Sequence, residues 1–470
     1  MASNSLQGKL GTFTLIALGV SGVVGSSWIY TNGKFFEEYG AGGMIFGLAL
    51  GTILAACVAL SYAQLASLFP RAGGEVVFSY TVLGRPLGFL TGWLLIGAYV
   101  SSLAFYFTSF GVLLEFYIPE MANFPAYTLA GATVTWPIIT AGLLLTALFY
   151  ALNARGASFG GQLQVVLFIA LVGIGLSLAV VGFGAGSWEN FWPPFDEDQN
   201  PTLSTLRFVV PGMTYMAGFG LIATLAEDAK LPAKKIGELV VATVLIAGLF
   251  YCLVLASSAF ILPWEQVAGM EQGTITAFTE AGFPFLGALA FSIAILGLLT
   301  SFLGLFMATS RIVVALARVN LLPNRFAAID PKYGTPKNAL QLVVAITVIL
   351  GLLGRGAMTA FLDTGGIYLG IVWIMVVACH LRLRTRHPSL YHSSKLRAGF
   401  VPIIGAAGAA MTIALAVWPG TSMSLKWPLE YIVLLGWAGV GFAFYAASKP
   451  MDRDEALTEL LGENKLAEEI

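Results

Sequence analysis

The sequence predicts an all-α polytopic membrane protein, because its composition lacks the charge that a water-facing surface needs. Hydrophobic residues make up 57% of the 470 residues and charged residues only 10%, whereas soluble globular proteins contain roughly 25% charged residues. Glycine, which is more frequent in membrane helices than in soluble ones, occurs 54 times. The composition argues against a disordered chain, and a net charge of −1 provides no basic surface for nucleic acid.

The apolar stretches predict twelve transmembrane helices. A helix that crosses the roughly 30 Å hydrocarbon layer needs about 20 mainly apolar residues. The predicted spans are residues 10–37, 41–69, 84–116, 127–152, 158–184, 206–228, 235–262, 282–318, 337–354, 357–383, 399–418 and 428–448. The three cysteines lie inside these stretches without metal-ligand spacing, so we interpret them as small core residues.

Positive charges in the short loops predict the orientation, because Lys and Arg accumulate on the cytoplasmic side. An N-terminus on the inside places all but four of the 24 Lys and Arg residues there. The exceptions are Lys34, Arg207, Arg355 and Lys426. We therefore expect a multi-pass protein of the plasma (inner) membrane, with residues 1–9 and the tail 449–470 in the cytoplasm.

Two spans contain residues that disfavour a continuous helix. Residues 19–27 include three glycines and three serines, and residues 211–220 include Pro211 and three glycines. Each glycine inside a helix costs roughly 1 kcal/mol relative to alanine. Non-helical backbone at membrane depth is tolerated where it lines a cavity, although small residues also allow close helix packing.

The positions of the two breaks favour a binding site. Each break lies in the first helix of a set of five, residues 10–184 and residues 206–383, and an odd number of helices gives the two sets opposite orientations. Paired breaks in inverted halves indicate a transporter's central site. Residues 399–448 add two C-terminal helices.

The electrostatics of a broken helix predict the class of substrate. The N-terminus of a half-helix presents free amides and partial positive charge, which suit a carboxylate. Unwound carbonyl groups and half-helix C-termini suit an ammonium group or a cation. A zwitterionic amino acid carries both charges. We therefore expect the protein to lie in the lipid bilayer and to bind an amino acid as its small-molecule partner.

Six motifs in order along most of the chain resemble the amino acid–polyamine–organocation (APC) superfamily of permeases. The most specific is Phe69-Pro-Arg-Ala-Gly-Gly-Glu75 followed by Gly88-Phe-Leu-Thr-Gly-Trp93. The others are Val24-Gly25-Ser26-Ser27, Asn153-Ala-Arg-Gly156, Ala217-Gly-Phe-Gly220, Ala226-Glu-Asp-Ala-Lys-Leu-Pro232 and Ala308-Thr-Ser-Arg311 with Gly334-Thr-Pro336. The resemblance implies a LeuT-like 5+5 inverted repeat with broken helices 1 and 6, and a secondary transporter rather than an enzyme.

The resemblance also implies roles for individual residues. The amides of Ser26 and Ser27, beside Gly25, would receive the substrate carboxylate. The carbonyl groups of Val23, Thr214 and Ala217 would receive its ammonium group, beside Gly218. The candidate selectivity residues, for which ordinary helix packing is an equal alternative, are Tyr215, Met216, Phe219 and Phe291.

Three departures from the family pattern bear on coupling. Ser27 replaces a glycine of the helix 1 turn, helix 5 contains no lysine, and Gly220 stands where the family frequently has a glutamate. Apart from Asp363, we expect no acid near the breaks. The last two departures count against proton coupling through those two groups.

A sodium site and an acidic gate are further candidates. The hydroxyls of Thr300 and Ser301, with carbonyl groups near Val20 and Val23, resemble the sodium ligands of LeuT-like symporters, although such hydroxyls usually bond to their own helix. Sodium symport, proton coupling and exchange all stay open, with no other cofactor expected. Asp363, an acid within span 357–383, is a gating candidate because intramembrane acids are usually functional.

The scarcity of charge near the breaks favours a neutral amino acid substrate, because a cationic side chain would need a buried counter-charge. The alternatives are a polyamine, cationic amino acid or nucleobase carrier of the same fold, or a membrane sensor that does not transport. The sequence indicates no accessory subunit.

Overall fold

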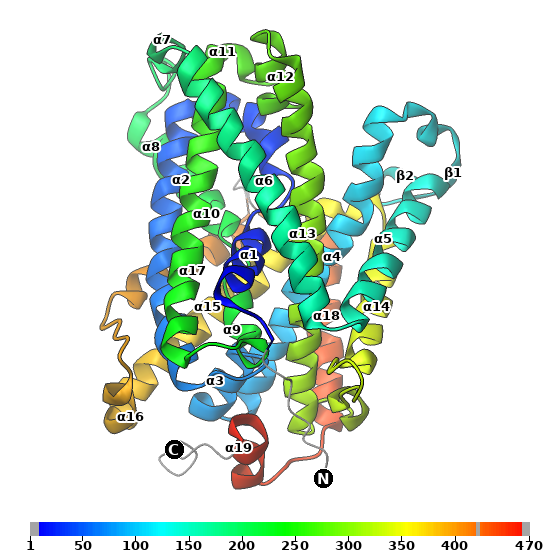
Figure 1. Ribbon diagram of the computed structural model, residues 1–470, viewed down its shortest axis with the longest axis vertical. Coiled ribbons are helices and arrows are strands. Elements are labelled where there is room, and N and C mark those ends of the chain that lie inside the picture. Colours follow the sequence, from blue (N-terminus) through cyan, green and yellow to red (C-terminus); the bar gives the residue numbers. More distant parts are fainter. Residues whose placement is uncertain (1–8, 420–423, 463–470) are drawn as a thin grey trace.

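The computed structural model describes residues 9–419 and 424–462 and shows a bundle of long helices around a central, short one (Figure 1). The α-helices are α1 Thr12–Val23, α2 Trp28–Leu68, α3 Glu75–Leu83, α4 Arg85–Tyr117, α5 Trp136–Ala154, α6 Ala157–Ala185, α7 Trp188–Phe191, α8 Pro201–Tyr215, α9 Leu221–Thr224, α10 Ala233–Ile261, α11 Trp264–Val267, α12 Gly273–Glu280, α13 Pro284–Arg318, α14 Lys337–Gly351, α15 Met358–Arg386, α16 Pro388–Ser393, α17 Pro402–Val417, α18 Leu429–Ala447 and α19 Arg453–Leu461. Short 3₁₀ helices are η1 Pro119–Asn123, η2 Ala226–Asp228, η3 Asn324–Ala327 and η4 Arg355–Ala357.

The helices confirm a multi-pass membrane protein. Among the described residues, eight helices are long and apolar enough to cross a membrane, and α1, α14 and α17 are shorter apolar helices. The predicted spans coincide with these helices and with α8 followed by α9. The count of twelve crossings and the inverted repeat stay predictions.

The predicted start of the fourth span, residue 127, is wrong. Strands β1 Pro125–Leu129 and β2 Ala132–Thr135 form an antiparallel hairpin there, and α5 begins only at Trp136. Its two-residue turn, Ala130 and Gly131, has φ angles of 51° and 76°, which is the positive-φ geometry that matches the twist of paired strands. The alternation of threonine, valine and tyrosine in this segment suits a strand.

Helix α2 continues from the first predicted span into the second without a loop. The two spans meet at Gly40, whose φ of 73° and ψ of 160° mark a kink inside α2. Further along α2, Gly47 and Gly51 face α8, where a methyl group at either position would collide with the α8 backbone or Phe208. These two glycines are used for close helix packing.

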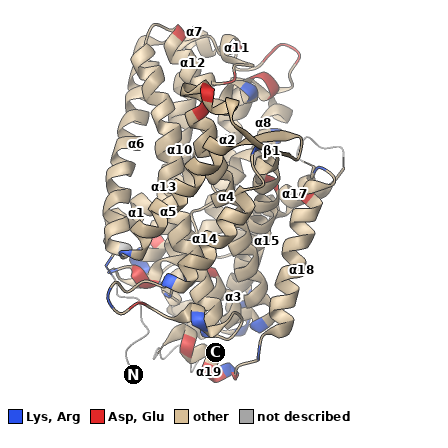
Figure 2. Ribbon diagram, turned by 90° about the vertical axis from the view of Figure 1, so that its right-hand side faces the viewer, with Lys and Arg blue, Asp and Glu red and all other residues tan. Residues whose placement is uncertain are grey.

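Both ends of the described chain lie at one end of the bundle, here called the terminal end, and α7, α11 and α12 lie at the opposite, distal end (Figure 1). Charged residues gather toward these two ends, while the middle is nearly free of them (Figure 2). The first eight residues and residues 463–470, which include Lys465 of the predicted cytoplasmic tail, lie outside the described residues.

The part of the tail that is described forms a docked helix. In α19 the side chains of Ala456, Leu457, Leu460 and Leu461 are buried, and the helix packs on α3 and α13. Arg71, which follows α2, donates from Nε to the carbonyl oxygen of Leu461 at 2.9 Å. This helix covers the terminal end of α3.

Candidate functional site

The first predicted break separates α1 from α2 at residues 24–27. The amide of Val24 still donates to the carbonyl of Val20 at 2.7 Å, whereas the amide of Gly25 turns back to Val23 at 3.0 Å. The chain becomes helical again at Trp28, whose indole Nε1 donates to the carbonyl of Gly25 at 2.9 Å. A side chain at Gly25 would place its Cβ 2.7 Å from the hydroxyl of Tyr106.

The second predicted break separates α8 from α9 at residues 216–220. The amide of Ala217 donates to the carbonyl of Thr214 at 2.9 Å, and the amide of Leu221 donates to Gly218 at 3.0 Å. Gly218 has a φ of 106°, a conformation that L side chains rarely adopt. The glycine therefore permits the chain to leave one short helix and enter the next.

The two breaks lie directly against each other. A methyl group at Gly218 would overlap with the carbonyl of Gly22, and one at Gly297 of α13 would overlap with the carbonyl of Gly25. Because these positions carry no side chain, the backbones of α1, the second break and α13 approach each other closely. The glycines thus serve close packing and interruption together.

A cavity of about 500 Å³ opens beside the breaks, within the usual size range of small-molecule sites. The predicted substrate-binding residues that line it are Val23, Gly25, Ser27, Thr214, Tyr215, Ala217 and Gly218. Aromatic side chains of α2, α4 and α10 complete this part of the lining, namely Trp28, Tyr99, Tyr106 and Tyr251. Sequence analysis missed these four, because no pattern along one helix shows which face meets the breaks.

Backbone groups of both signs at the two breaks have hydrogen-bonding capacity left over. Among the described residues, the amides of Ser26 and Ser27 find no hydrogen-bond acceptor, as expected at the start of α2. The carbonyl of Ala217 likewise receives no donor from the described chain. The carbonyl of Val23 is already bonded, since it accepts the hydroxyl of Tyr251 at 2.7 Å.

Four of the predicted substrate-binding residues lie outside the cavity lining. Ser26 and Met216 are buried in the protein, with Met216 beside the hydroxyl of Thr52. Phe219 stacks on Trp373 with ring centroids 5.5 Å apart. Phe291 packs against Phe116 and Tyr117 at the distal end of α4. For Met216, Phe219 and Phe291 the alternative of helix packing describes their contacts.

The candidate sodium ligands are bonded to the chain itself. Thr300 donates to the carbonyl of Leu296 in its own helix at 2.8 Å. Ser301 reaches across to the carbonyl of Ser21 in α1 at 2.8 Å. The carbonyl of Val20 accepts Val24, as described above. Ser301 thus links α13 to α1, whereas Thr300 does not.

The distal part of the cavity is charged. Asp363 of α15 lines it together with Lys34, Glu38 and Lys426. The backbone amide of Lys426 donates to Glu430 Oε2 at 2.6 Å, and Glu430 is 2% exposed. Asp363 therefore lies where the cavity leads away from the breaks, and its role as a gate stays a prediction.

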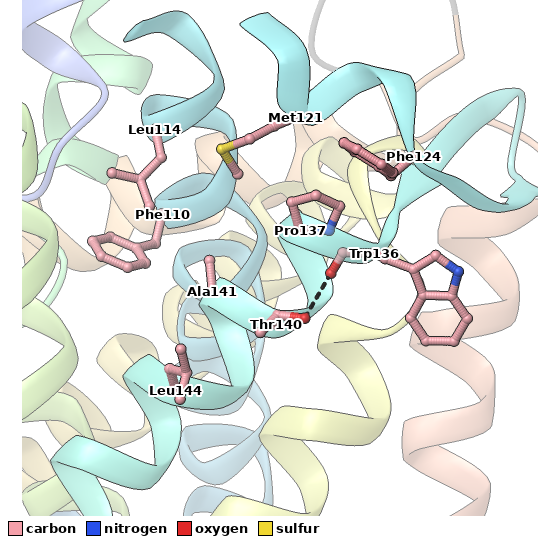
Figure 3. A pocket seen from close by; sticks show the side chains of 9 residues that line it. All are labelled: Phe110, Leu114, Met121, Phe124, Trp136, Pro137, Thr140, Ala141 and Leu144. Atoms are coloured by element: carbon pink, nitrogen blue, oxygen red, sulfur yellow. Dashed lines mark hydrogen bonds between the residues drawn. The ribbon is translucent and has the colours of Figure 1, made fainter. Parts of the chain in front are cut away.

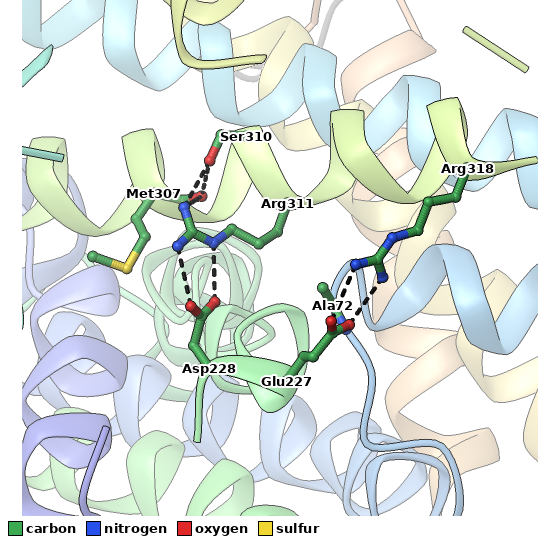
Figure 4. A network of polar contacts seen from close by, with 7 residues as sticks. All are labelled: Ala72, Glu227, Asp228, Met307, Ser310, Arg311 and Arg318. Carbon is green, nitrogen blue, oxygen red and sulfur yellow. Dashed lines mark hydrogen bonds and ion pairs between the residues drawn. The ribbon is translucent and has the colours of Figure 1, made fainter. Parts of the chain in front are cut away.

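Ion pairs fasten the terminal side of the second break to α13 (Figure 4). Arg311 holds both carboxylate oxygens of Asp228, with Nε–Oδ2 at 2.9 Å and Nη2–Oδ1 at 3.1 Å. Both side chains are nearly fully buried. Arg318 holds Glu227 in the same two-pronged way, and Glu227 also accepts the amide of Ala72 at 3.1 Å.

Glu75 is the functional candidate that sequence analysis missed. The predicted spans 41–69 and 84–116 leave Glu75 in the loop between them, and no acid besides Asp363 was expected near the breaks. Glu75 instead begins α3 and is fully buried against the second break. A methyl group at Gly220 would overlap with Glu75 Oε1. Thr224 of α9 donates to Glu75 Oε2 at 2.9 Å, and Oε1 has no hydrogen-bond partner among the described residues.

The signal for Glu75 was present in the sequence. The family's frequent helix 6 glutamate is replaced by Gly220, and an acid stands in the most specific motif at position 75. Only the fold shows that the two positions adjoin. Burial raises the pKa of Glu75, which lies outside the predicted spans, to about 7.

A second hollow of about 490 Å³ lies between α4, η1 and α5 (Figure 3). It is lined mainly by apolar side chains, and the hydroxyl of Thr140 is already bonded to the carbonyl of Trp136 at 2.9 Å. No ionisable side chain lines it. It offers nothing that would recognise the charges of an amino acid.

A bundle of apolar helices whose interrupted segments line a central cavity defines a multi-pass membrane permease. The chain belongs to the amino acid permease family, because the sequence model of that family matches residues 10–440. This match covers both breaks, the cavity lining and Glu75.

Similar proteins extend over most of the chain. The branched-chain amino acid permease BcaP of Lactococcus lactis subsp. cremoris is 26% identical over 388 residues, which cover 80% of this chain and 82% of that protein. BcaP of Bacillus subtilis is 25% identical over 450 residues, covering 94% and 93%. The methylthioribose transporter of Bacillus subtilis is 26% identical over 460 residues, covering 94% of each chain.

The buried ion pair predicts a large effect of Asp228→Asn. The substitution leaves Arg311 buried without its carboxylate partner, which should lower the free energy of unfolding by roughly 3–5 kcal/mol. Glu115→Gln is the matched control, because Glu115 pairs with Arg355 near the surface and exposed pairs contribute only about 0–1 kcal/mol. Titration with SDS in detergent micelles measures both, and equal losses would contradict this assignment.

Glu75 predicts a pH dependence of stability. Because its pKa rises from 4.5 in the unfolded chain to about 7 in the fold, the folded state binds the proton more tightly. The stabilisation is complete below pH 4.5 and is lost as the pH rises through about 7. Melting temperatures in detergent should fall over this range in the wild type and fall less in Glu75→Gln. Parallel curves would show that Glu75 does not titrate there.

Proposed function

We propose that the protein is a secondary active transporter of amino acids with neutral side chains, by alternating access around the cavity at the two breaks. The observation that carries the proposal is that Ser27, whose amide has no acceptor among the described residues, and Ala217, whose carbonyl has no donor there, line the same cavity. The adjoining Ser26 contributes a second such amide. A substrate carboxylate suits the amides at the start of α2, and its ammonium group suits the carbonyl.

The lining near the breaks supports a neutral side chain. Aromatic and small residues surround this part of the cavity, and its charged lining residues are Lys34, Glu38, Asp363 and Lys426 in the distal part. Burying an unpaired charge is costly, so an apolar or small polar side chain fits the inner part best. The two BcaP relatives, named as branched-chain amino acid permeases, support the same proposal.

In the conformation of this structure, the ion pairs at the terminal side of the second break would act as a closed gate between the cavity and the terminal end. Arg311 with Asp228, and Arg318 with Glu227, tie η2 to α13. Release of substrate toward the terminal end would require these pairs to separate or to move as one body with α9. The proposed topology has five-helix inverted halves, twelve crossings and cytoplasmic termini, so that release would occur into the cytoplasm.

A second candidate is a carrier of cationic amino acids or polyamines. Glu38 and Asp363 line the distal part of the cavity, where they could face an amine on the substrate's far end. These carboxylates would then bind the amine of the substrate's side chain at the distal side of the cavity. The α-carboxylate and α-ammonium groups of the substrate would still bind the backbone groups of the breaks. Competition by neutral and cationic substrates for uptake separates the two candidates.

Uptake by purified protein in liposomes tests the function directly. Vesicles loaded with unlabelled leucine should accumulate labelled leucine by exchange, and an external panel of neutral, cationic and acidic amino acids, polyamines and nucleobases should compete in order of affinity. Competition by neutral amino acids is expected. Competition only by arginine, lysine or polyamines would support the second candidate, and no uptake under sodium, proton or exchange gradients would contradict transport.

The contact between the breaks predicts the effect of Gly218→Ala. The new methyl group would overlap with the carbonyl of Gly22 and force φ = 106° on a residue with a side chain. Strain and overlap of a few kcal/mol should lower leucine exchange by about tenfold or more. Gly173→Ala on α6 is the control, because its methyl group would meet open space. Equal exchange in both variants would contradict the proposed site.

A further inference from the structure

The side chain of Glu75 fits against the second break only because position 220 is a glycine. Any side chain at Gly220 would overlap with Glu75 Oε1, and the ring of Tyr62 lies on the same side, 3.0 Å from that position. The carboxyl group of Glu75 therefore contacts the second break from α3, an element that is not part of the broken helix. Its Oε1 occupies the space that the Cβ of any side chain at position 220 would need.

The surroundings of Glu75 contain hydroxyl groups and no paired cation. They comprise Tyr62 on α2, Tyr99 on α4, Thr224 on α9 and the thiol of Cys379 on α15 next to Tyr62. No Lys, Arg or His of the described chain forms an ion pair with Glu75. Arg311, the buried cation of the adjacent α13, is held by both oxygens of Asp228.

A buried carboxylate without a counter-charge is costly, and the protonated acid avoids that cost. Oε1 is also the oxygen with a free lone pair among the described groups, since Oε2 accepts Thr224. Protonation at Oε1 would therefore change both the charge and the hydrogen bonding at the second break.

The cavity reaches this acid through two hydroxyl groups. Tyr99 lines the cavity beside the breaks and interacts with the side chain of Thr224. Thr224 in turn donates to Glu75 Oε2 at 2.9 Å. A proton that enters the cavity would therefore have a short series of hydroxyl groups along which to reach the Glu75 carboxyl group at Oε2, and a half-turn of that group exchanges its two oxygens. This route starts at the substrate cavity and ends at the moving segment.

We propose that Glu75 binds the proton that couples transport, in place of the helix 6 carboxylate that Gly220 removes. A lone pair of Oε1 forms the O–H bond while the cavity is open toward the distal end, and the neutral acid permits the breaks to change position with substrate bound. When the cavity opens toward the terminal end, the same bond breaks and one proton leaves on that side. The inference rests on the proposed transport function.

The test compares two kinds of transport by the same protein. A pH difference of one unit, acidic outside, supports at most about tenfold accumulation for one proton per substrate. The wild type should approach this ratio, and Glu75→Gln, which keeps the shape but cannot release a proton, should stay at a ratio of about one. Leucine exchange, which needs no net proton movement, should continue in Glu75→Gln.

Two further variants guard against misfolding and a merely structural role. Glu75→Asp keeps the titrating group and should retain part of the accumulation, whereas Glu238→Gln removes an exposed carboxylate that pairs with Lys234 and should change nothing. The double variant Gly220→Glu with Glu75→Gly moves the acid onto the broken helix. It should restore accumulation driven by the pH difference, whereas Gly220→Glu alone should disrupt the site through overlap with Glu75.

The outcomes separate this inference from the proposed function. If neither the wild type nor any variant exchanges leucine or another panel substrate, the transport proposal fails. If exchange is normal and Glu75→Gln accumulates substrate like the wild type, or if the wild type ignores the pH difference, Glu75 does not carry the coupling proton. Loss of accumulation with retained exchange, rescued by the relocated acid, is the result expected.

Discussion

The structure depends on one constraint: a backbone amide or carbonyl inside a membrane must find a partner. Helices provide these hydrogen-bond partners along most of the chain. At the two breaks, which lie beside the same cavity, some backbone groups have no partner within the described chain. Glycine makes the exception feasible, since Gly218 adopts a φ of 106° and packs directly on the carbonyl of Gly22. A zwitterion can be bound without charged side chains by the backbone groups that remain unpaired within the described chain. These are the amides of Ser26 and Ser27 and the carbonyl of Ala217.

The same constraint explains where charge does occur. Asp228 and Arg311 are buried as a fully bonded pair at the terminal side of the second break, so their charges compensate each other. Glu75 has no such partner, and its neighbours are hydroxyl groups. A paired acid holds elements together, whereas an unpaired one responds to protons. Two acids close to one broken helix therefore serve different purposes, which their immediate partners determine.

Much of this was predictable from local sequence. Composition and hydropathy identified a multi-pass membrane protein, and glycine-rich interruptions located both breaks within a few residues. The hairpin before α5 was missed because apolar, β-branched residues satisfy a hydropathy window as well as a strand. Phe291 and Glu75 were misplaced for another reason: the first packs at the distal end of α4, and the second enters a site built by other elements. Contacts between distant segments leave no periodic signal in a single sequence.

The central claim is that backbone groups of the two breaks recognise the substrate's carboxylate and ammonium groups. Calorimetric binding of leucine, leucine methyl ester and isopentylamine to the purified protein tests the carboxylate half of this claim most directly, because these ligands share a side chain and an ammonium group and differ only in the carboxylate. The account predicts that leucine binds and that loss of the carboxylate charge weakens binding by about tenfold or more, as expected for a lost charge-assisted contact. Equal binding of all three ligands would contradict it.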